Sequence, residues 1–285
     1  MTPDEYCQDK AAKSGSSFYY SFRFLPEKQR QAIIALYAFC REVDDTVDEI
    51  TDTDLARTKL GWWREEIQRT FKNEATHPVG KALQKAIENF ELHEEYFMEI
   101  IDGMEMDLDQ FSYPEFKQLA LYCHRAASVV GLLSVEIFGY QDRKTLKYAE
   151  YLGMALQLTN IIRDVREDAE RGRIYLPQEE LKQFNVNSEA LLALKSTPEL
   201  VELLKFQTAR AKEYYRQAFE VLPAGDRYSQ RTGLIMAAIY EATLDEIEID
   251  NFQVMHHRVS LTPIRKLWIA WRTARKEKRL HKSHK

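Results

Sequence analysis

Two pairs of aspartates stand four residues apart in helix-like parts of this sequence. Asp44 and Asp48 form the first pair, and Asp164 and Asp168 form the second. Because side chains four residues apart stack on one side of an α-helix, each pair would present two carboxylates together. Mg²⁺ accepts a few carboxylate oxygens and keeps further positions for phosphate oxygens and water. The two pairs therefore indicate metal-assisted departure of a diphosphate.

The first pair falls where core residues belong. On the helix predicted by the apolar spacing from Ile33 to Val47, Asp44 lies on the apolar face and Asp48 at its border, whereas Asp45 points further away. Two like charges on a buried face are costly unless a cation lies between them. An acidic run is also typical of a solvated patch, so this cluster alone leaves both interpretations open.

The second pair lies in a stretch, 152–168, that is apolar on almost every side. Gln157, Asn160, Asp164 and Asp168 form its single polar stripe. A helix that is apolar nearly all round is expected to be buried, so this stripe must face an internal polar cavity. Two such helices can face each other across a cavity in a bundle. The seven histidines offer no zinc spacing near either pair, and no Ser/His/Asp or Cys/His nucleophile pattern appears.

Helix signals run along nearly the whole chain and would position these residues. Ten glycines and eight prolines among 285 residues are few for a sandwich, barrel or propeller. Helices are expected over about 26–50, 53–73, 79–91, 94–110, 114–138, 143–168, 197–221 and 227–250. The sequence predicts one all-α domain, residues 1–262, followed by a basic tail, residues 263–285.

Charge and composition exclude several classes of protein. The net charge of −5 excludes a globally basic nucleic-acid-binding protein. The first 13 residues have no apolar segment typical of a signal peptide, and no stretch approaches the ~18 apolar residues of a membrane span. Three cysteines without metal-ligand spacing are typical of reduced thiols in a cytosolic protein. We therefore expect a cytoplasmic protein.

The aspartates lie in motifs that resemble the squalene/phytoene synthase family, the head-to-head isoprenoid synthases. The resemblance covers about residues 14–260 in order, and its motifs are Tyr37-Ala38-Phe39-Cys40-Arg41 continuing into Asp44-Asp45-x-x-Asp48, Tyr122-Cys123-x-Arg125 with Val130-Gly131, Gln157-Leu158-Thr159-Asn160-Ile161-Ile162-Arg163-Asp164 through Asp168, and Arg171-Gly172-Arg173-Ile174-Tyr175-Leu176-Pro177. Two further segments are most similar to bacterial hopanoid-pathway presqualene diphosphate synthases: Gly103-Met104-Glu105-Met106-Asp107 and Leu261-Thr262-Pro263-Ile264-Arg265-Lys266-Leu267-Trp268.

The resemblance implies a prenyltransferase-like helical bundle around a central cavity, in which two prenyl diphosphates bind with two or three Mg²⁺ ions. It implies that Asp44, Asp48, Asp164, Asp168 and Asn160 hold metal, and that Tyr122 lies near the reacting centre with a catalytic role. The loop from Arg171 to Tyr175 would form a flap. The implied substrate-binding residues are Ser17, Arg41, Gln157, Asn160, Arg171, Arg173, Tyr175, Tyr240 and Arg258.

The leading hypothesis is condensation of two farnesyl diphosphates to presqualene diphosphate, on the way to squalene and hopanoids. The released diphosphate or Tyr122 would take the proton. Alternatives are phytoene formation from two geranylgeranyl diphosphates, and squalene or dehydrosqualene formation, with NADPH needed only for squalene. A terpene cyclase usually carries one Asp-rich cluster and a different second site. A non-catalytic assembly protein on the same fold would be expected to have lost carboxylates or flap arginines.

The basic tail suggests contact with a membrane surface. Nine Lys or Arg residues stand between positions 265 and 285 against one acid, Glu277, and Trp268 and Trp271 precede most of them. A basic amphipathic helix of this kind can lie on anionic lipid, here the inner face of the membrane, with tryptophan at the interface. A disordered soluble tail is an equally good interpretation. The sequence does not fix the oligomeric state.

Overall fold

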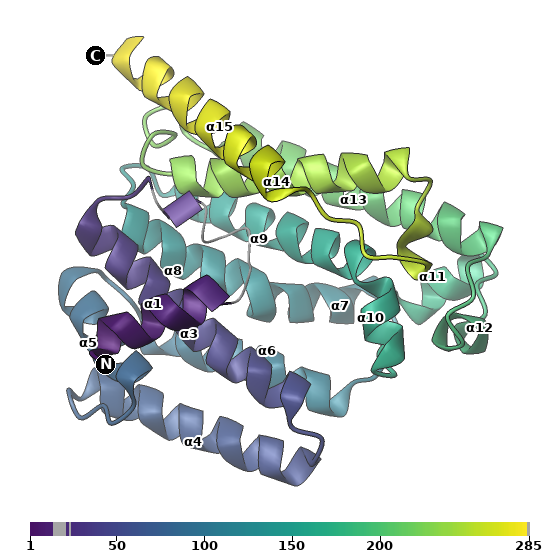
Figure 1. Cartoon of the computed structure of the whole chain (residues 1–285), viewed down its shortest axis with the longest axis horizontal. Coiled ribbons are helices and arrows are strands. Elements are labelled where there is room, and N and C mark those ends of the chain that lie inside the picture. The colour runs from purple at the N-terminus through teal and green to yellow at the C-terminus, as the bar shows by residue number, and fades with distance from the viewer. Residues whose placement is uncertain (14–20, 23, 284–285) are drawn as a thin grey trace.

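A computed structural model of the chain describes residues 1–13, 21–22 and 24–283 (Figure 1). Within these ranges the chain is mostly helical, and no strand occurs. The longer helices are α1 (Pro3–Lys13), α3 (Glu27–Glu49), α4 (Thr53–Phe71), α5 (Pro78–Asn89), α6 (Glu94–Asp109), α7 (Phe116–Cys123), α8 (Val129–Phe138), α9 (Lys144–Arg163), α13 (Pro198–Val221), α14 (Arg231–Ile249) and α15 (Pro263–Ser283). The shorter elements are η1 (His124–Ser128), α10 (Val165–Glu170), α11 (Gln178–Gln183), α12 (Ser188–Leu192) and η2 (Gln253–Met255). The predicted all-α fold is confirmed.

The hydrophobic core consists of two clusters that meet in the middle of the bundle. One cluster joins α1, α3, α4, α5 and α6 with one side of α8. The other joins α7, α9, α13 and α14. In Figure 1 α7, α8 and α9 lie in the middle of the bundle, between α4 and α6 on one side and α14 and α15 on the other. Helices α3 and α9, which carry the two aspartate pairs or their neighbours, therefore belong to different clusters. Each helix can turn its polar residues toward a space between the two clusters.

Helix α3 begins directly after Pro26, whose fixed backbone angle suits the start of a helix. Ile33, Leu36 and Val43 are buried along its core face. Thr46 is also buried, and its hydroxyl donates to the carbonyl of Glu42 at 2.8 Å. This packing holds the acidic end of α3 in the protein interior.

The helix expected over 143–168 is interrupted at Asp164. Helix α9 ends at Arg163, and α10 begins at Val165, because Asp164 leaves the helical region with φ −102° and ψ 16°. The chain still donates from the Asp164 amide to the Asn160 carbonyl at 2.8 Å, and from the Asp168 amide to the Asp164 carbonyl at 2.9 Å. The prediction of one continuous helix was wrong, but hydrogen bonds between residues four apart persist across the break.

The helix expected over 114–138 also contains an irregular turn. Between α7 and α8 the segment η1 is a π-helix, and such turns are frequent at functional sites. Gly153 of α9 allows the close approach of this turn, because a Cβ there would lie 2.4 Å from the Cα of Ser128. The π-turn therefore packs tightly against the helix that carries the second polar stripe.

One segment passes a test of length and apolar composition for a membrane span. It is Phe116–Phe138, which comprises α7, η1 and α8, and half of its most apolar window is buried. The expectation that no stretch is long and apolar enough for a membrane span was therefore wrong. Its packing against α6 and α9 is typical of a core helix.

The end of the described chain is an ordered helix rather than a disordered tail. Helix α15 packs along α14 on the outside of the bundle (Figure 1). Ala270 and Glu277 are buried, and Arg227 donates to both carboxylate oxygens of Glu277, at 2.8 and 3.1 Å. His281 stacks on the ring of Tyr228. Over its described residues, 263–283, the predicted tail is therefore a helix that is attached to the bundle.

Candidate active site

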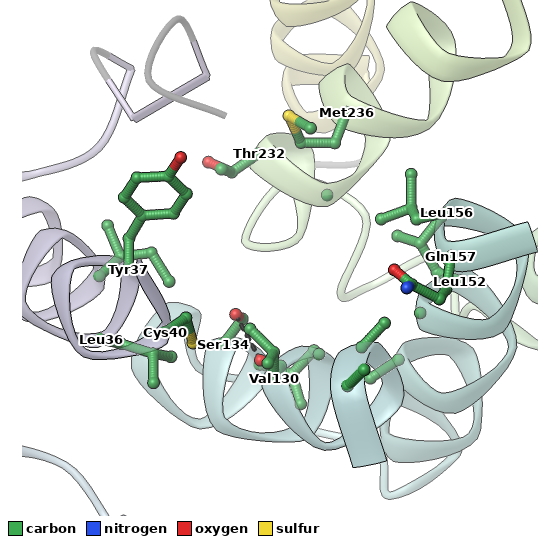
Figure 2. Close-up of a pocket in the computed structure, with 18 of the residues that line it drawn as sticks. Leu36, Tyr37, Cys40, Val130, Ser134, Leu152, Leu156, Gln157, Thr232 and Met236 are labelled. Atoms are coloured by element: carbon green, nitrogen blue, oxygen red, sulfur yellow. Dashed lines mark hydrogen bonds between the residues drawn. The ribbon is translucent and has the colours of Figure 1, made fainter. Parts of the chain in front are cut away.

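An apolar cavity lies between α3, α8, α9 and α14 (Figure 2). It encloses about 1200 Å³ including its open mouth. In Figure 2 Tyr37 and Cys40 project into this space from α3, Val130 from α8, and Leu152 and Leu156 from α9. Thr232 and Met236 of α14 cover another side. A cavity with such a lining suits a long hydrocarbon chain.

Polar residues from two helices lie on the wall of the same cavity. Arg41 and Asp44 of α3 and Gln157 and Asn160 of α9 all line it. The amide nitrogen of Asn160 donates to the Gln157 side-chain oxygen at 3.2 Å, while the Asn160 oxygen is buried without a partner among the described residues. One part of each predicted polar stripe therefore lies on this cavity, whereas Asp48, Asp164 and Asp168 are not among its lining residues.

The first aspartate pair is held by cations. Arg41 donates to both Asp44 and Asp45. Lys10 of α1 lies 2.9 Å from Asp45, so Asp45 points away from the cavity, as its position on the helix predicted. Burial raises the pKa of Asp44 to about 6, against the opposing charge of Arg41 and helped by the charge of Asp48.

The two aspartates of the second pair differ in their cationic partners. Arg163 and Arg258 each donate to Asp164 at 2.8 Å, and these arginines outweigh burial and lower the pKa of Asp164. Asp168 forms no ion pair in the described part of the chain. Burial raises its pKa to about 8, helped by the charge of Asp164 and opposed by Arg171. Asp168 is therefore the carboxylate of the two pairs that most lacks a cation.

The loop 171–175, called the flap loop below, follows α10 in the chain and contacts the end of α3. Arg173 donates to Asp48 at 2.9 Å and to the Val47 carbonyl at 3.0 Å. Arg171 lies 3.1 Å from Asp48 and remains half exposed. The flap arginines thus bring Asp48 into contact with the chain that follows Asp168, and in this state guanidinium groups neutralise carboxylates of both pairs.

Tyr122 and Tyr175 lie on one buried carboxyl group rather than on the apolar cavity. Asp107 of α6 is 4% exposed and accepts from Tyr175 at 2.7 Å and from Tyr122 at 3.1 Å. Burial raises the pKa of Asp107 to about 7, although both tyrosines and Arg173 oppose the rise. Tyr122 is 5% exposed and is not among the residues that line the cavity.

The remaining predicted residues fall in three places. Tyr240 is buried on α14, where burial raises its pKa and the charge of Arg163 opposes the rise. Arg258 follows η2 and contacts Asp164, as described above. Ser17 lies outside the residues that the structure describes.

Sequence reasoning missed Asp107 and Arg163 as site residues. Asp107 is the one buried acid of α6, and it lies among the buried residues Gly103, Met104, Met106 and Leu108. An acid on an otherwise apolar helix face was the signal that could have found it. Arg163 directly precedes Asp164, and only the break between α9 and α10 shows that its guanidinium turns back onto that carboxylate.

The oxygen atoms near the cavity can be compared with those that Mg²⁺ requires. Among the described residues no three His, Cys, Asp or Glu side chains lie close enough together to hold a metal ion alone. Pairs of carboxylates are what Mg²⁺ uses when substrate phosphates complete its shell. The unpartnered oxygen of Asn160 adds a further possible ligand on the cavity wall. The residues therefore fit an ion that arrives with a diphosphate.

Comparison with known proteins places this site in a family. Residues 11–265 match the family model described as squalene/phytoene synthase. The chain is 35% identical to a presqualene diphosphate synthase of Sinorhizobium fredii, over 94% of this chain and 96% of that protein. It is also 35% identical to a phytoene synthase of Arthrospira platensis, over 92% and 89% of the two chains.

Solved structures agree with these relatives. A dehydrosqualene synthase in complex with a ligand superposes with a TM-score of 0.87 at 27% identity, covering 97% of both chains. A squalene synthase from Alicyclobacillus acidocaldarius gives a TM-score of 0.78 at 28% identity, covering 88% of this chain and 94% of that one. The resemblance drawn from the sequence motifs is confirmed. The chain is therefore a prenyltransferase that belongs to the squalene/phytoene synthase family.

Proposed function

We propose that this enzyme condenses two molecules of farnesyl diphosphate into presqualene diphosphate, with Mg²⁺ and without NADPH. The observation that carries the proposal is an apolar cavity on which Arg41, Asp44, Gln157 and Asn160 converge from α3 and α9. Relatives named presqualene diphosphate synthase, from Sinorhizobium fredii and Zymomonas mobilis, support the choice at 35% and 36% identity. Phytoene synthases are as similar, so two geranylgeranyl diphosphates remain the alternative substrate.

The chemistry begins with loss of one diphosphate. Its allylic carbon–oxygen bond breaks, and the electron pair leaves with the diphosphate. The C2=C3 double bond of the second substrate attacks the allylic cation, and loss of a proton closes a cyclopropane ring. Mg²⁺ bound with the diphosphate would neutralise charge on the leaving group. Aromatic and apolar side chains of the cavity exclude water and stabilise positive charge.

The arginines would bind the diphosphate oxygens. Arg41, Arg171 and Arg173 now contact carboxylates, and a guanidinium fork matches phosphate as well as carboxylate. When metal takes the carboxylate oxygens, these donors become available for the diphosphate. Arg258 would act in the same way beside Asp164.

For the proton, we propose the released diphosphate as acceptor. The Tyr122 hydroxyl already donates to Asp107, and burial and the charge of Asp107 raise the pKa of Tyr122 well above its usual value. It would therefore have to leave this bond to serve as a base. We expect Tyr122 to act near the reacting centre through its contact with Asp107.

Purified protein should convert farnesyl diphosphate with Mg²⁺ alone into a product with the mass of presqualene diphosphate, and one diphosphate should be released per product. Mass spectrometry and a diphosphate assay measure both. Parallel reactions contain geranylgeranyl diphosphate, EDTA or NADPH. Turnover of geranylgeranyl diphosphate alone would replace the farnesyl proposal by phytoene synthesis, and a cyclised sesquiterpene would overturn head-to-head condensation.

We also propose that this enzyme is cytoplasmic and that it contacts an anionic membrane surface through α15. The side of α15 away from α14 exposes four apolar residues at helical spacing: Ile264, Leu267, Trp268 and Trp271. The following turns of the same helix expose Arg272, Arg275, Lys276, Lys278, Arg279 and Lys282. Apolar residues beside basic ones suit insertion at anionic headgroups, where each basic residue contributes about 1 kcal/mol.

Replacing Trp268 and Trp271 together by serine should weaken binding to anionic vesicles at least about tenfold, because the interface loses both aromatic anchors. Substitution is preferable to truncation, since α15 covers α14 and pairs with Arg227. Co-sedimentation at low and high salt is the measurement. Leu55→Ser, which removes an apolar residue of similar exposure on α4, is the control. Equal binding to neutral vesicles would contradict the proposal.

A further inference from the structure

The flap loop is attached to the protein body at its middle and at its end. At its middle Arg173 donates to Asp48 and to the Val47 carbonyl of α3. At its end the Tyr175 hydroxyl donates to Asp107 of α6 at 2.7 Å. Between them the Ile174 amide donates to the Phe111 carbonyl at 2.9 Å. The position of Arg173 therefore also depends on the contacts of the two residues that follow it, Ile174 and Tyr175.

Asp107 is held by phenols alone in the described part of the chain. One of its oxygens accepts from Tyr175 and the other accepts from Tyr122, and no lysine or arginine forms an ion pair with it. The rings of Tyr113, Tyr122 and Tyr175 pack on one another, with centroids 5.1 to 5.8 Å apart. Losing either phenol would leave a buried carboxyl group with one partner fewer.

We infer that Asp107 is a positioning residue that fastens the flap loop through Tyr175. Its hydrogen bond to Tyr175 fixes the backbone two residues after Arg173, and so keeps the Arg173 guanidinium on Asp48. Its second bond, to Tyr122, ties α7 to the same point. One carboxyl group thus joins α6, α7 and the flap loop behind the carboxylate site. The consequence for diphosphate binding rests on the function proposed above, whereas the fastening itself does not.

Limited trypsin digestion tests the fastening directly, because trypsin cleaves after Arg171 and Arg173. Tyr175→Phe removes the hydrogen bond and keeps the ring. We expect cleavage in the flap loop to become about tenfold faster, as expected for loss of one hydrogen bond to an acidic group. Mass spectrometry identifies the new ends, and cleavage after Lys205 on α13 serves as an internal reference for global unfolding. Asp107→Asn should act in the same direction.

Tyr113→Phe is the matched control within the same aromatic cluster. The Tyr113 hydroxyl is buried and has no hydrogen-bond partner among the described residues, although its ring stacks on Tyr175. Its removal should leave flap cleavage unchanged. Equal cleavage rates in Tyr175→Phe and Tyr113→Phe would overturn the inference, as would equal acceleration after Lys205.

Binding of inorganic diphosphate with Mg²⁺, measured by calorimetry, tests the link to the site. Tyr175→Phe should weaken this binding about tenfold through the flap arginines, and Tyr113→Phe should leave it unchanged. Unchanged binding in Tyr175→Phe, with faster flap cleavage, would remove the link and keep the fastening. Failure of the unaltered protein to bind diphosphate would contradict the proposed function, while the trypsin comparison would still decide the inference.

Discussion

Replacing Asp164 by asparagine is expected to lower turnover at least about a thousandfold while the helical fold persists. The change removes a charge that would hold metal and keeps nearly the same volume. It also removes the negative charge that pairs with Arg163 and Arg258, so the melting temperature without ligand should fall. Asp168→Asn should abolish turnover equally. Asp168 has no ion pair within the described residues, and its pKa is raised. The melting temperature of the Asp168→Asn variant should therefore stay equal or rise.

Steady-state kinetics and thermal unfolding of both variants check this pair of expectations. Asp102→Asn is a suitable control, because Asp102 is a partly exposed acid of α6 that pairs with Arg64 of α4. It should keep normal turnover. Near-normal turnover in Asp164→Asn or Asp168→Asn would remove that residue from the metal site.

Mg²⁺ and a non-reactive diphosphate together should raise the melting temperature far more than either raises it alone. The carboxylate pairs repel one another when the arginines leave them, and the ion needs phosphate oxygens to complete its shell. At a hundred times the dissociation constant, binding stabilises the fold by about 2.7 kcal/mol. For a chain of this length this corresponds to about 5 °C or more.

Differential scanning fluorimetry with Mg²⁺, diphosphate, both, and both in Asp168→Asn measures the effect. The variant should lose most of the combined shift. If Mg²⁺ alone raised the melting temperature as much as the combination, the carboxylates would form a structural cation site instead.

The sequence predicted the long helices well because their apolar spacing is dictated by the same core that folds them. Helices expected over 53–73 and 197–221 occur as α4 and α13 with nearly the same bounds. The break at Asp164 and the π-turn after Cys123 were not predictable from periodicity. Both depend on tertiary contacts, namely the arginines around Asp164 and the close approach of Gly153.

The site was predicted unevenly for a similar reason. The polar stripes of α3 and α9 follow from helical geometry alone, and Asp44, Gln157 and Asn160 line one cavity, whereas Asp48, Asp164 and Asp168 are not among its lining residues. Which cation holds each carboxylate does not follow, because Arg258 lies 94 residues from Asp164 along the chain. Asp107 was overlooked because it stands among other acids of α6, and its burial is what distinguishes it from them. The remaining predicted roles in catalysis and metal binding stay predictions.

The central claim is that the two aspartate pairs form one site for metal and diphosphate at the polar part of the apolar cavity. A crystal structure with Mg²⁺ and a non-reactive thio analogue of farnesyl diphosphate tests it most directly. The account predicts metal between the diphosphate and carboxylates of both pairs, flap arginines on diphosphate oxygens, and the prenyl chain along Tyr37, Leu152 and Met236. Diphosphate bound elsewhere, or metal held by one pair without diphosphate, would contradict the account.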